Sequence, residues 1–216
     1  MQLYDLLICN GSLPAEPRAA ALADSARSII CADGGANKAR AYGITPQTVI
    51  GDFDSISPQT LSEFEKAYVE FIHAPQQDRT DFEKALLLLE ERGARKVIIL
   101  GVTGGQLDHT LGNLSIIQRY VKKLDMTLYD PDFRIDIITG TKTFTSRKGQ
   151  RISIVPLRLS SGIWYEGLEY PLPTTILKNG LNEGTCNTAV EDEFTVHLAK
   201  GTLLIMRQLD DSPSLW

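Results

Sequence analysis

The stretch Val49-Ile50-Gly51-Asp52-Phe53-Asp54-Ser55 predicts a buried strand that ends in two closely spaced carboxylates. Two β-branched residues favour a strand, and the glycine permits a turn directly after it. In extended backbone, residues i and i+2 point to the same side, so Asp52 and Asp54 would crowd together at the strand end. Two carboxylates about 4 Å apart repel by about 4 kcal/mol at an effective dielectric constant of about 20. A divalent cation, a basic neighbour or a raised pKa would offset this repulsion, and a solvated acidic turn is the alternative.

Segments of strand character alternate with segments of helical character on both sides of this stretch. Strands are predicted at residues 3–9, 28–32, 48–50, 69–73, 96–102, 127–129 and 134–139. Helices are predicted at residues 15–26, 58–67, 80–92 and 108–121, with a shorter one ending near residue 42. Thr80 and Glu83, at the start of the third of these, have the spacing of a helix-capping box. This alternation predicts a doubly wound, mostly parallel α/β domain over residues 1–140.

The pattern changes after Gly140, where short apolar segments alternate with turn signals and long helical periodicity is absent. Such a pattern is typical of antiparallel β structure. Residues 141–216 are therefore predicted to form a small antiparallel β-sandwich domain.

The overall composition excludes several classes of protein. The 216 residues carry a net charge of −5 and no basic run, which argues against a nucleic-acid-binding surface. No apolar run approaches the length of about 20 residues that a membrane span needs, and no signal peptide is recognisable. The three cysteines, Cys9, Cys31 and Cys186, are too far apart for a disulfide framework or a Cys-x-x-Cys metal site. We therefore expect a reducing, cytoplasmic setting.

Acidic residues follow several of the predicted strands. Because ligands of α/β sheets bind beyond the carboxyl ends of the strands, these acids should converge at one edge. Mg²⁺ is the leading cation there, since it favours one or two carboxylates together with substrate phosphates. Two of the acids, Asp81 and Asp108, could instead be present because the helix dipole favours an acid in the first turn of a helix. The full set of acids is Asp33, Asp52, Asp54, Asp78, Asp81 and Asp108.

Two glycine pairs, Gly34-Gly35 and Gly104-Gly105, come just after predicted strands and could present backbone amides to phosphate groups. The phosphate-binding motif Gly-x-x-x-x-Gly-Lys-Ser/Thr does not occur in the sequence, and no Gly-x-Gly-x-x-Gly motif follows the first predicted strand. His109 follows the second pair and is a candidate ligand-binding residue. In the C-terminal half, Trp164 and Tyr170 fit either a β-domain core or an aromatic platform for a flat or cationic ligand.

Four ordered motifs carry a resemblance to a known family: Cys31-Ala32-Asp33-Gly34-Gly35-Ala36-Asn37, Gly51-Asp52-Phe53-Asp54-Ser55, Asp78-Arg79-Thr80-Asp81, and 101–109, which reads Gly-Val-Thr-Gly-Gly-Gln-Leu-Asp-His. The chain closely resembles the thiamine pyrophosphokinase family. The resemblance implies Mg²⁺-dependent transfer of a pyrophosphoryl group from ATP to the hydroxyl of thiamine, giving thiamine diphosphate and AMP. It also implies a homodimer with the active site at the subunit interface.

The resemblance also implies roles for individual residues. Asp52, Asp54 and Asp81 match the magnesium ligands. The implied catalytic carboxylates are Asp33, Asp52, Asp54, Asp81 and Asp108. The implied nucleotide-side residues are Asn10, Gly34, Gly35, Asn37, Gln77, Asp78, Arg79, Thr80, Gly104, Gly105, His109 and Asn113. The implied thiamine-side residues are Tyr170, Thr185 and Asn187.

Two positions depart from the family pattern. Cys186 stands where the family usually has serine before Asn187, and Tyr170 stands where some members have a stacking tryptophan. The sequence does not choose between Asp108 and Asp33 as acceptor of the hydroxyl proton. The alternative functions are a Mg²⁺-dependent pyrophosphokinase of another heterocyclic alcohol, such as a hydroxymethylpterin, and a non-catalytic sensor of nucleotide or thiamine.

Overall fold

Two compact units make up the computed structural model, which describes residues 4–182 and 184–210. The chain passes from the first unit to the second between Pro131 and Asp132. The first unit is an α/β structure with a parallel sheet, and the second is built from antiparallel strands, so the predicted fold class is confirmed. No helix among the described residues is long and apolar enough to cross a membrane.

The first unit contains a sheet of parallel strands in the order β6-β5-β1-β2-β3-β4. The strands are β1 (Asp5–Ile8), β2 (Ser28–Ala32), β3 (Thr48–Gly51), β4 (Glu70–His73), β5 (Lys96–Leu100) and β6 (Asp125–Tyr129). The central strands are short apolar runs that are buried along nearly their whole length. Burial on both faces is the normal environment of a parallel sheet, because helices cover each side.

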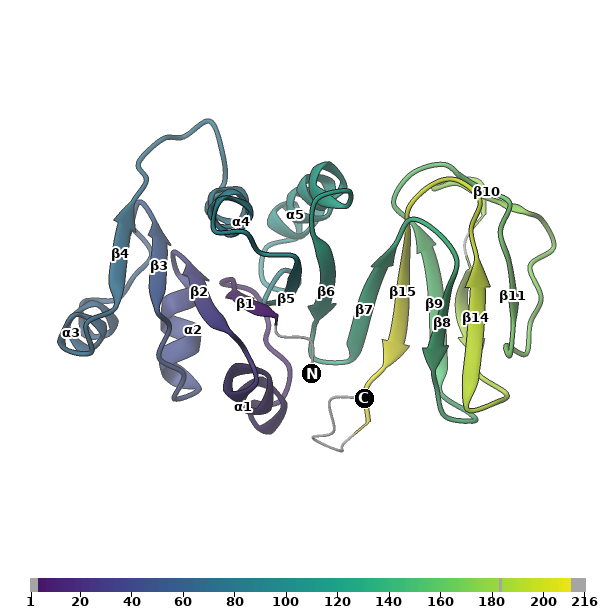
Figure 1. Ribbon diagram of the computed structural model, residues 1–216, viewed down its shortest axis with the longest axis horizontal. Helices are drawn as coiled ribbons and strands as arrows, with labels where there is room; N and C mark the ends of the chain where they lie inside the picture. The colour runs from purple at the N-terminus through teal and green to yellow at the C-terminus, as the bar shows by residue number, and fades with distance from the viewer. Residues whose placement is uncertain (1–3, 183, 211–216) are drawn as a thin grey trace. The chain divides into compact units, whose positions relative to one another are not determined.

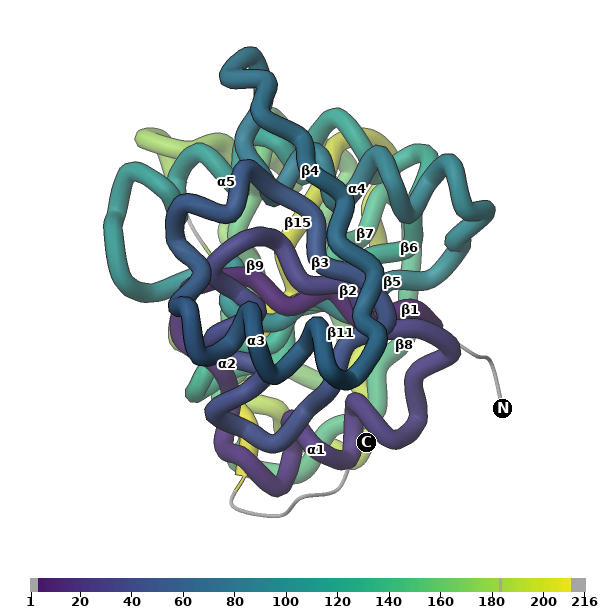
Figure 2. Tube along the Cα trace, turned by 90° about the vertical axis from the view of Figure 1, so that its left-hand side faces the viewer, coloured from purple at the N-terminus to yellow at the C-terminus, as the bar shows by residue number. Residues whose placement is uncertain are grey.

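Five helices connect these strands: α1 (Glu16–Asp24), α2 (Gly35–Ala41), α3 (Pro58–Lys66), α4 (Asp81–Glu91) and α5 (Leu107–Tyr120). Right-handed crossovers place α1, α2 and α3 on one face of the sheet and α4 and α5 on the other. Figure 1 shows this division, with α1 and α2 below the strands and α4 and α5 above them, and Figure 2 shows it from the side.

The neighbouring strands β1 and β5 lead into helices on opposite faces, so the order of the sheet reverses between them. Such a switch point opens a crevice at the carboxyl ends of the strands. The two loops that leave β1 and β5 are hydrogen-bonded to each other: the amide of Gly11 donates to the carbonyl of Gly101 at 2.9 Å, and that of Ser12 to Thr103 at 2.8 Å. Gly101 has a φ of 70°, and a Cβ there would lie 2.4 Å from the Cys9 carbonyl oxygen. Glycine is therefore required where the two loops meet.

The second unit consists of three antiparallel sheets, in the orders β13-β9-β15-β7, β11-β14-β8 and β10-β12. Its strands are β7 (Phe133–Ile138), β8 (Lys142–Thr145), β9 (Arg151–Pro156), β10 (Ser160–Ser161), β11 (Trp164–Glu166), β12 (Ile176–Leu177), β13 (Gly184–Thr188), β14 (Glu193–His197) and β15 (Leu203–Gln208). Alternate residues of the two larger sheets form one apolar core, as in a sandwich. Within it the rings of Phe144 and Phe194 stack with centroids 5.1 Å apart.

Strand β7 differs from its expected place in the α/β half. It follows β6 without a helix between them, and it pairs antiparallel with β15 along its whole length. A parallel partner would need a crossover of a dozen or more residues, and the chain offers only a few between Tyr129 and Phe133. The strand lies within residues 132–212 of the second unit.

Candidate functional site

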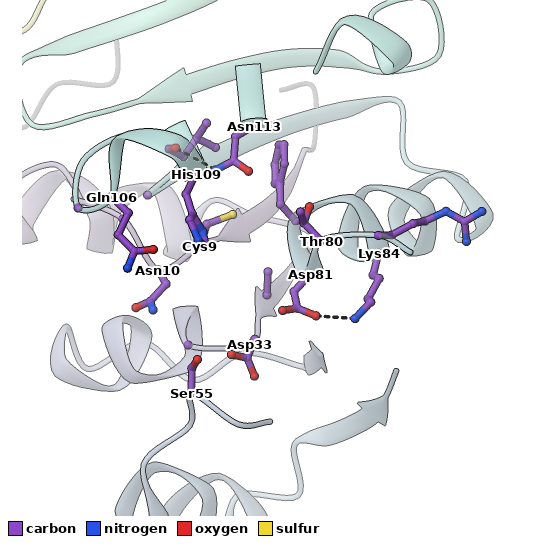
Figure 3. A pocket seen from close by; sticks show the side chains of 18 of the residues that line it. Cys9, Asn10, Asp33, Ser55, Thr80, Asp81, Lys84, Gln106, His109 and Asn113 are labelled. Atoms are coloured by element: carbon purple, nitrogen blue, oxygen red, sulfur yellow. Dashed lines mark hydrogen bonds and ion pairs between the residues drawn. The ribbon is translucent and has the colours of Figure 1, made fainter. Parts of the chain in front are cut away.

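A cavity of about 660 Å³ lies in the first unit, at the carboxyl ends of the parallel strands. It is lined by the loops that follow β1, β2, β3, β4 and β5 and by the first turns of α4 and α5. Figure 3 shows the side chains around it, with Asp33, Ser55, Asp81 and Lys84 gathered apart from Gln106, His109 and Asn113. The cavity thus has an acidic end and an end with neutral polar groups.

Three carboxylates from distant parts of the chain meet at the acidic end. Each of Asp33, Asp52 and Asp81 offers an oxygen that lies within 4.8 Å of the other two. Asp33 follows β2, Asp52 follows β3, and Asp81 begins α4. Three of the six acids that the sequence predicts at this edge of the sheet therefore come together in the structure.

Asp33 is the buried member of the cluster, with 6% of its surface exposed. Its Oδ1 atom has no hydrogen-bond partner among the described residues, although buried carboxylate oxygens are normally paired. Burial raises the pKa of Asp33, and the nearby charges of Asp81 and Asp52 raise it further. Its φ of 41° is also unusual for a residue with a side chain. An unpaired buried oxygen beside two further carboxylates fits a site for a divalent cation.

Asp52 has the opposite electrostatic environment. Its Oδ1 accepts a hydrogen bond from the backbone amide of Asp54 at 3.2 Å, and its Oδ2 accepts one from Nε2 of Gln77 at 3.1 Å. These bonds favour the charged form and lower the pKa of Asp52. The cluster therefore contains one carboxylate held in its charged form and another, Asp33, in which burial opposes the charge.

Asp81 is held by the start of helix α4. Thr80 caps that helix, since its Oγ1 accepts the amide of Glu83 at 3.3 Å, so the spacing of the two residues correctly predicts a helix start. Lys84 lies one turn further on, and its Nζ donates to Oδ1 of Asp81 at 2.8 Å. Lys84 also lines the cavity, and sequence reasoning missed it. The available signal was its position three residues after Asp81, on the same face of the helix.

Asparagines fasten the loops around the cavity. Asn37 donates from Nδ2 to the carbonyl of Ser55 at 2.7 Å, and its Oδ1 accepts the amide of Ser57 at 3.0 Å. Asn113 donates to the carbonyl of Val102 at 3.1 Å. Asn113 lines the cavity as well, whereas Asn37 lies outside the lining and acts as a brace for the loop after β3.

Most of the expected site residues of the first unit meet at this cavity. Those that line it are Asn10, Asp33, Gly34, Asp52, Gln77, Asp78, Arg79, Thr80, Asp81, Gly104, Gly105, His109 and Asn113. Those outside the lining are Gly35, Asn37, Asp54 and Asp108. Asp54 is exposed and accepts a hydrogen bond from the hydroxyl of Ser55 at 2.8 Å, and Asp108 accepts one from the amide of His109 at 2.9 Å.

The expected thiamine-side residues belong to the second unit. Asn187 is 4% exposed there, and protein groups use its whole carboxamide. Oδ1 accepts the amides of Tyr170 and Thr188, and Nδ2 donates to the carbonyl of Tyr170 and the hydroxyl of Tyr165. Asn187 thus fixes the segment that carries Tyr170, which is itself exposed, as is Thr185.

Cys186 departs from ordinary strand geometry. It is exposed, lies in an irregular part of the β13–β9 pairing and has a φ of 60°. Its sulfur accepts a hydrogen bond from the Arg151 guanidinium at 3.1 Å, and its amide donates to Oγ of Ser153 at 3.0 Å. The bulge turns Thr185 and Cys186 toward solvent.

Comparison with known proteins identifies relatives of both units. Residues 19–129 match the family model "Thiamin pyrophosphokinase, catalytic domain", and residues 136–206 match "Thiamin pyrophosphokinase, substrate-binding domain". The chain is 30% identical over 173 residues to thiamine pyrophosphokinase of Bacillus subtilis, an alignment that covers 78% of this chain and 81% of the relative.

Solved structures show the same architecture. That of thiamine pyrophosphokinase from Bacillus subtilis matches with a TM-score of 0.81 and 25% identity, over 95% of this chain and 99% of that one. Thiamin pyrophosphokinase from Candida albicans matches with a TM-score of 0.85 over 97% and 90% of the two chains. At 18% identity the second likeness supports the fold alone.

Proposed function

Since this chain belongs to the thiamine pyrophosphokinase family and is an enzyme of that kind, we propose that it transfers the pyrophosphoryl group of ATP to the hydroxyl of thiamine. The products are thiamine diphosphate and AMP. The observation that carries this proposal is the cluster of Asp33, Asp52 and Asp81, which lines the cavity at the carboxyl ends of the parallel strands together with two glycine-rich loops. Acids alone would repel a polyphosphate, so the arrangement suits a nucleotide that brings a divalent cation.

We propose Asp52, Asp54 and Asp81 as the residues that hold Mg²⁺. When bound, the ion supplies positive charge that offsets the charge of the phosphates. Asp52 and Asp81 already share the cluster, and the exposed side chain of Asp54 lies two residues from Asp52 on a loop. Asp33, with its unpaired Oδ1, is the residue that competes with Asp54 for the third place.

In the proposed reaction the hydroxyl oxygen of thiamine attacks the β-phosphorus of ATP. The new O–P bond forms as the bond from that phosphorus to the bridging oxygen of AMP breaks, and AMP leaves with the electron pair. We assign the hydroxyl proton to Oδ1 of Asp33, because its burial and raised pKa suit a proton acceptor. Asp108 is the weaker candidate, since it lies outside the cavity lining and already accepts the amide of His109.

Backbone amides complete the proposed nucleotide site. The loop with Gly104 and Gly105, both at positive φ, leads into the N-terminus of α5, where amides and the helix dipole favour phosphate oxygens. Arg79 is half-exposed and lines the cavity, and we propose that its positive charge contacts a phosphate. On the thiamine side we propose Tyr170 and Thr185 as contact residues. Asn187 follows Thr185 in β13 and holds the segment that carries Tyr170.

From the family resemblance we also propose a homodimer with its active sites at the subunit interface, which sedimentation of the purified chain would test. From the cysteine usage we propose a cytoplasmic setting, which agrees with three free cysteines, two of them buried.

The reaction itself is tested by product analysis. Purified protein is incubated with ATP, Mg²⁺ and thiamine, and the mixture is separated by chromatography. We expect AMP and thiamine diphosphate in equal amounts. ADP in place of AMP would contradict pyrophosphoryl transfer, and turnover of a hydroxymethylpterin but not of thiamine would reassign the substrate. Absence of any product would favour a nucleotide or thiamine sensor.

A substitution separates Asp54 from Asp33 as the third metal ligand. Asp54→Asn should raise the Mg²⁺ concentration for half-maximal turnover about tenfold or more, because an amide oxygen binds Mg²⁺ more weakly than a carboxylate. The measurement is initial rate against Mg²⁺ concentration at saturating substrates. Asp24→Asn, an exposed change at the end of α1, is the matched control and should leave the curve in place. Unchanged Mg²⁺ dependence in Asp54→Asn would leave Asp33, Asp52 and Asp81 as the ligand set.

A further inference from the structure

Lys84 is a buried cation in an acidic cavity. Its side chain is 9% exposed, and its Nζ lies 2.8 Å from Oδ1 of Asp81 and 2.7 Å from the carbonyl oxygen of Ala74. Figure 3 shows the bond to Asp81 at the acidic end of the cavity. Burying a lysine is costly unless it is paired, so this position has a specific electrostatic environment.

The charges around Lys84 do not suit a polyphosphate by themselves. Asp33, Asp52 and Asp81 bring up to three negative charges together. A nucleotide polyphosphate adds more, and a single divalent cation does not balance the total. The lining contains two positively charged side chains, Lys84 and Arg79, among the described residues. Arg79 is half-exposed and lies 3.7 Å from Asp78, so Lys84 is the cation inside the cluster.

The ammonium group also has a donor to spare. A lysine ammonium carries three N–H donors, and the bonds to Asp81 and Ala74 use two of them. No third partner of Lys84 is present in the part of the chain that the structure describes. The remaining donor belongs to a group that lines the cavity, where an anionic oxygen of a ligand can accept it.

We propose that Lys84 is the residue that makes this acidic cavity receptive to the polyphosphate of the nucleotide. Its ammonium neutralises Asp81 while the site is free of nucleotide, and it donates a hydrogen bond to a phosphate oxygen when the nucleotide binds. Lys84 would then be a nucleotide-binding residue as well as a partner of Asp81. This inference rests on the proposed function, because it takes ATP as the ligand.

Replacing Lys84 should change the affinities for two ligands in opposite directions. Replacing Lys84 by a neutral residue removes a positive charge that attracts the anionic MgATP and repels a free cation. The affinity for MgATP should therefore fall, whereas the affinity for a divalent cation alone should stay the same or rise. A lysine that only shaped the metal site would weaken both when replaced.

The test compares Lys84→Met with the unchanged chain in two binding measurements without thiamine. We expect the dissociation constant for MgATP, measured by calorimetry, to rise about 10- to 100-fold, the range of a lost hydrogen bond to a charged group. The dissociation constant for Mn²⁺ alone, measured by electron paramagnetic resonance, should not rise. Lys66→Met makes the same charge change at an exposed site of α3 outside the cavity lining, and it should alter neither constant.

Either of two results would overturn this role. One is an equal affinity for MgATP in the unchanged chain and in Lys84→Met, and the other is a parallel loss of affinity for MgATP and for Mn²⁺. If Lys84→Met does not fold, Lys84→Gln keeps a donor for the Ala74 carbonyl while losing the charge, and the same two constants decide. If the unchanged chain binds no MgATP, the proposed function is contradicted as well. If the chain forms product and the variants bind MgATP as tightly as the unchanged chain, only the role of Lys84 is contradicted.

Discussion

Asp81→Asn should reduce kcat/KM for thiamine diphosphate formation by about a thousandfold. The carboxamide keeps the shape of the side chain but removes a charge that the cluster with Asp33 and Asp52 offers to a cation. It also leaves the buried ammonium of Lys84 without its anionic partner. Removing one group that stabilises developing charge in a water-poor site costs about 10²- to 10³-fold in other enzymes, and loss of a metal ligand belongs at the upper end.

The measurement is initial rate at saturating Mg²⁺ and ATP, followed by the amounts of AMP and thiamine diphosphate. Thermal unfolding is measured in parallel, because Asp81→Asn removes both the helix-dipole contribution of about 0.3–1 kcal/mol and the anionic partner of the buried Lys84 ammonium, so the loss of activity must be compared among folded proteins. Asp125→Asn, at the exposed start of β6, makes the same chemical change away from the cavity and should keep full activity. Activity of Asp81→Asn within tenfold of the unchanged chain would exclude Asp81 from the metal site.

Asp136→Asn should destabilise the second unit by about 3–5 kcal/mol, the cost of breaking a buried ion pair by removing one partner. Asp136 is 1% exposed. Its Oδ2 accepts hydrogen bonds from Arg207 at 2.8 Å and Arg134 at 3.2 Å, and Lys142 lies 3.9 Å from Oδ1. The amide would leave these cations without a buried counter-charge. The network joins β7 to its neighbour β15 and to β8 of the other sheet, so its loss should loosen the sandwich.

The effect of Asp136→Asn should depend on pH in a defined direction. Burial by itself would raise the pKa of Asp136, but the charges of Arg134 and Arg207 outweigh it and hold the pKa below its usual value. A carboxylate with a lowered folded-state pKa contributes stability that is present above its unfolded pKa of about 3.9 and is lost as the pH falls through the folded value. The difference in the free energy of unfolding between Asp136→Asn and the unchanged chain should therefore reach its maximum at neutral pH and decrease below about pH 4.

Tryptophan fluorescence during thermal unfolding is the measurement, because both tryptophans, Trp164 and Trp216, come after residue 131. A loss of this size should lower the midpoint by about 10 °C or more in a unit of this length. Asp192→Asn, an exposed change between β13 and β14, is the control and should unfold like the unchanged chain. A midpoint within about 2 °C of the unchanged chain would contradict a stabilising role for the Asp136 network.

Several features of the site were predictable because they depend on local sequence. Apolar runs followed by acids and glycines indicated where the strands end, and a parallel sheet brings such ends to one edge. The spacing of Thr80 and Glu83 predicted the start of α4, and the structure confirms the cap. Asp33, Asp52 and Asp81 were expected at one edge and meet there.

Other features depend on contacts between segments that no local pattern describes. The spacing of two puts Asp54 beside Asp52 in an extended chain, but the turn at Phe53, with a φ of 70°, leaves Asp54 outside the cluster. Asn187 directly follows the exposed residues Thr185 and Cys186, yet it is buried and both ends of its carboxamide are hydrogen-bonded to protein groups.

The sequence by itself determined the class of each half of this protein and the edge at which its polar residues gather. Periodicity and strand-end chemistry are properties of neighbouring residues, so they can be read without knowing the fold. The tertiary structure alone decided which carboxylates share a site, that Lys84 is buried against Asp81, and that β7 pairs with β15. These outcomes depend on distances and burial between residues far apart in the chain, which only the packed structure sets.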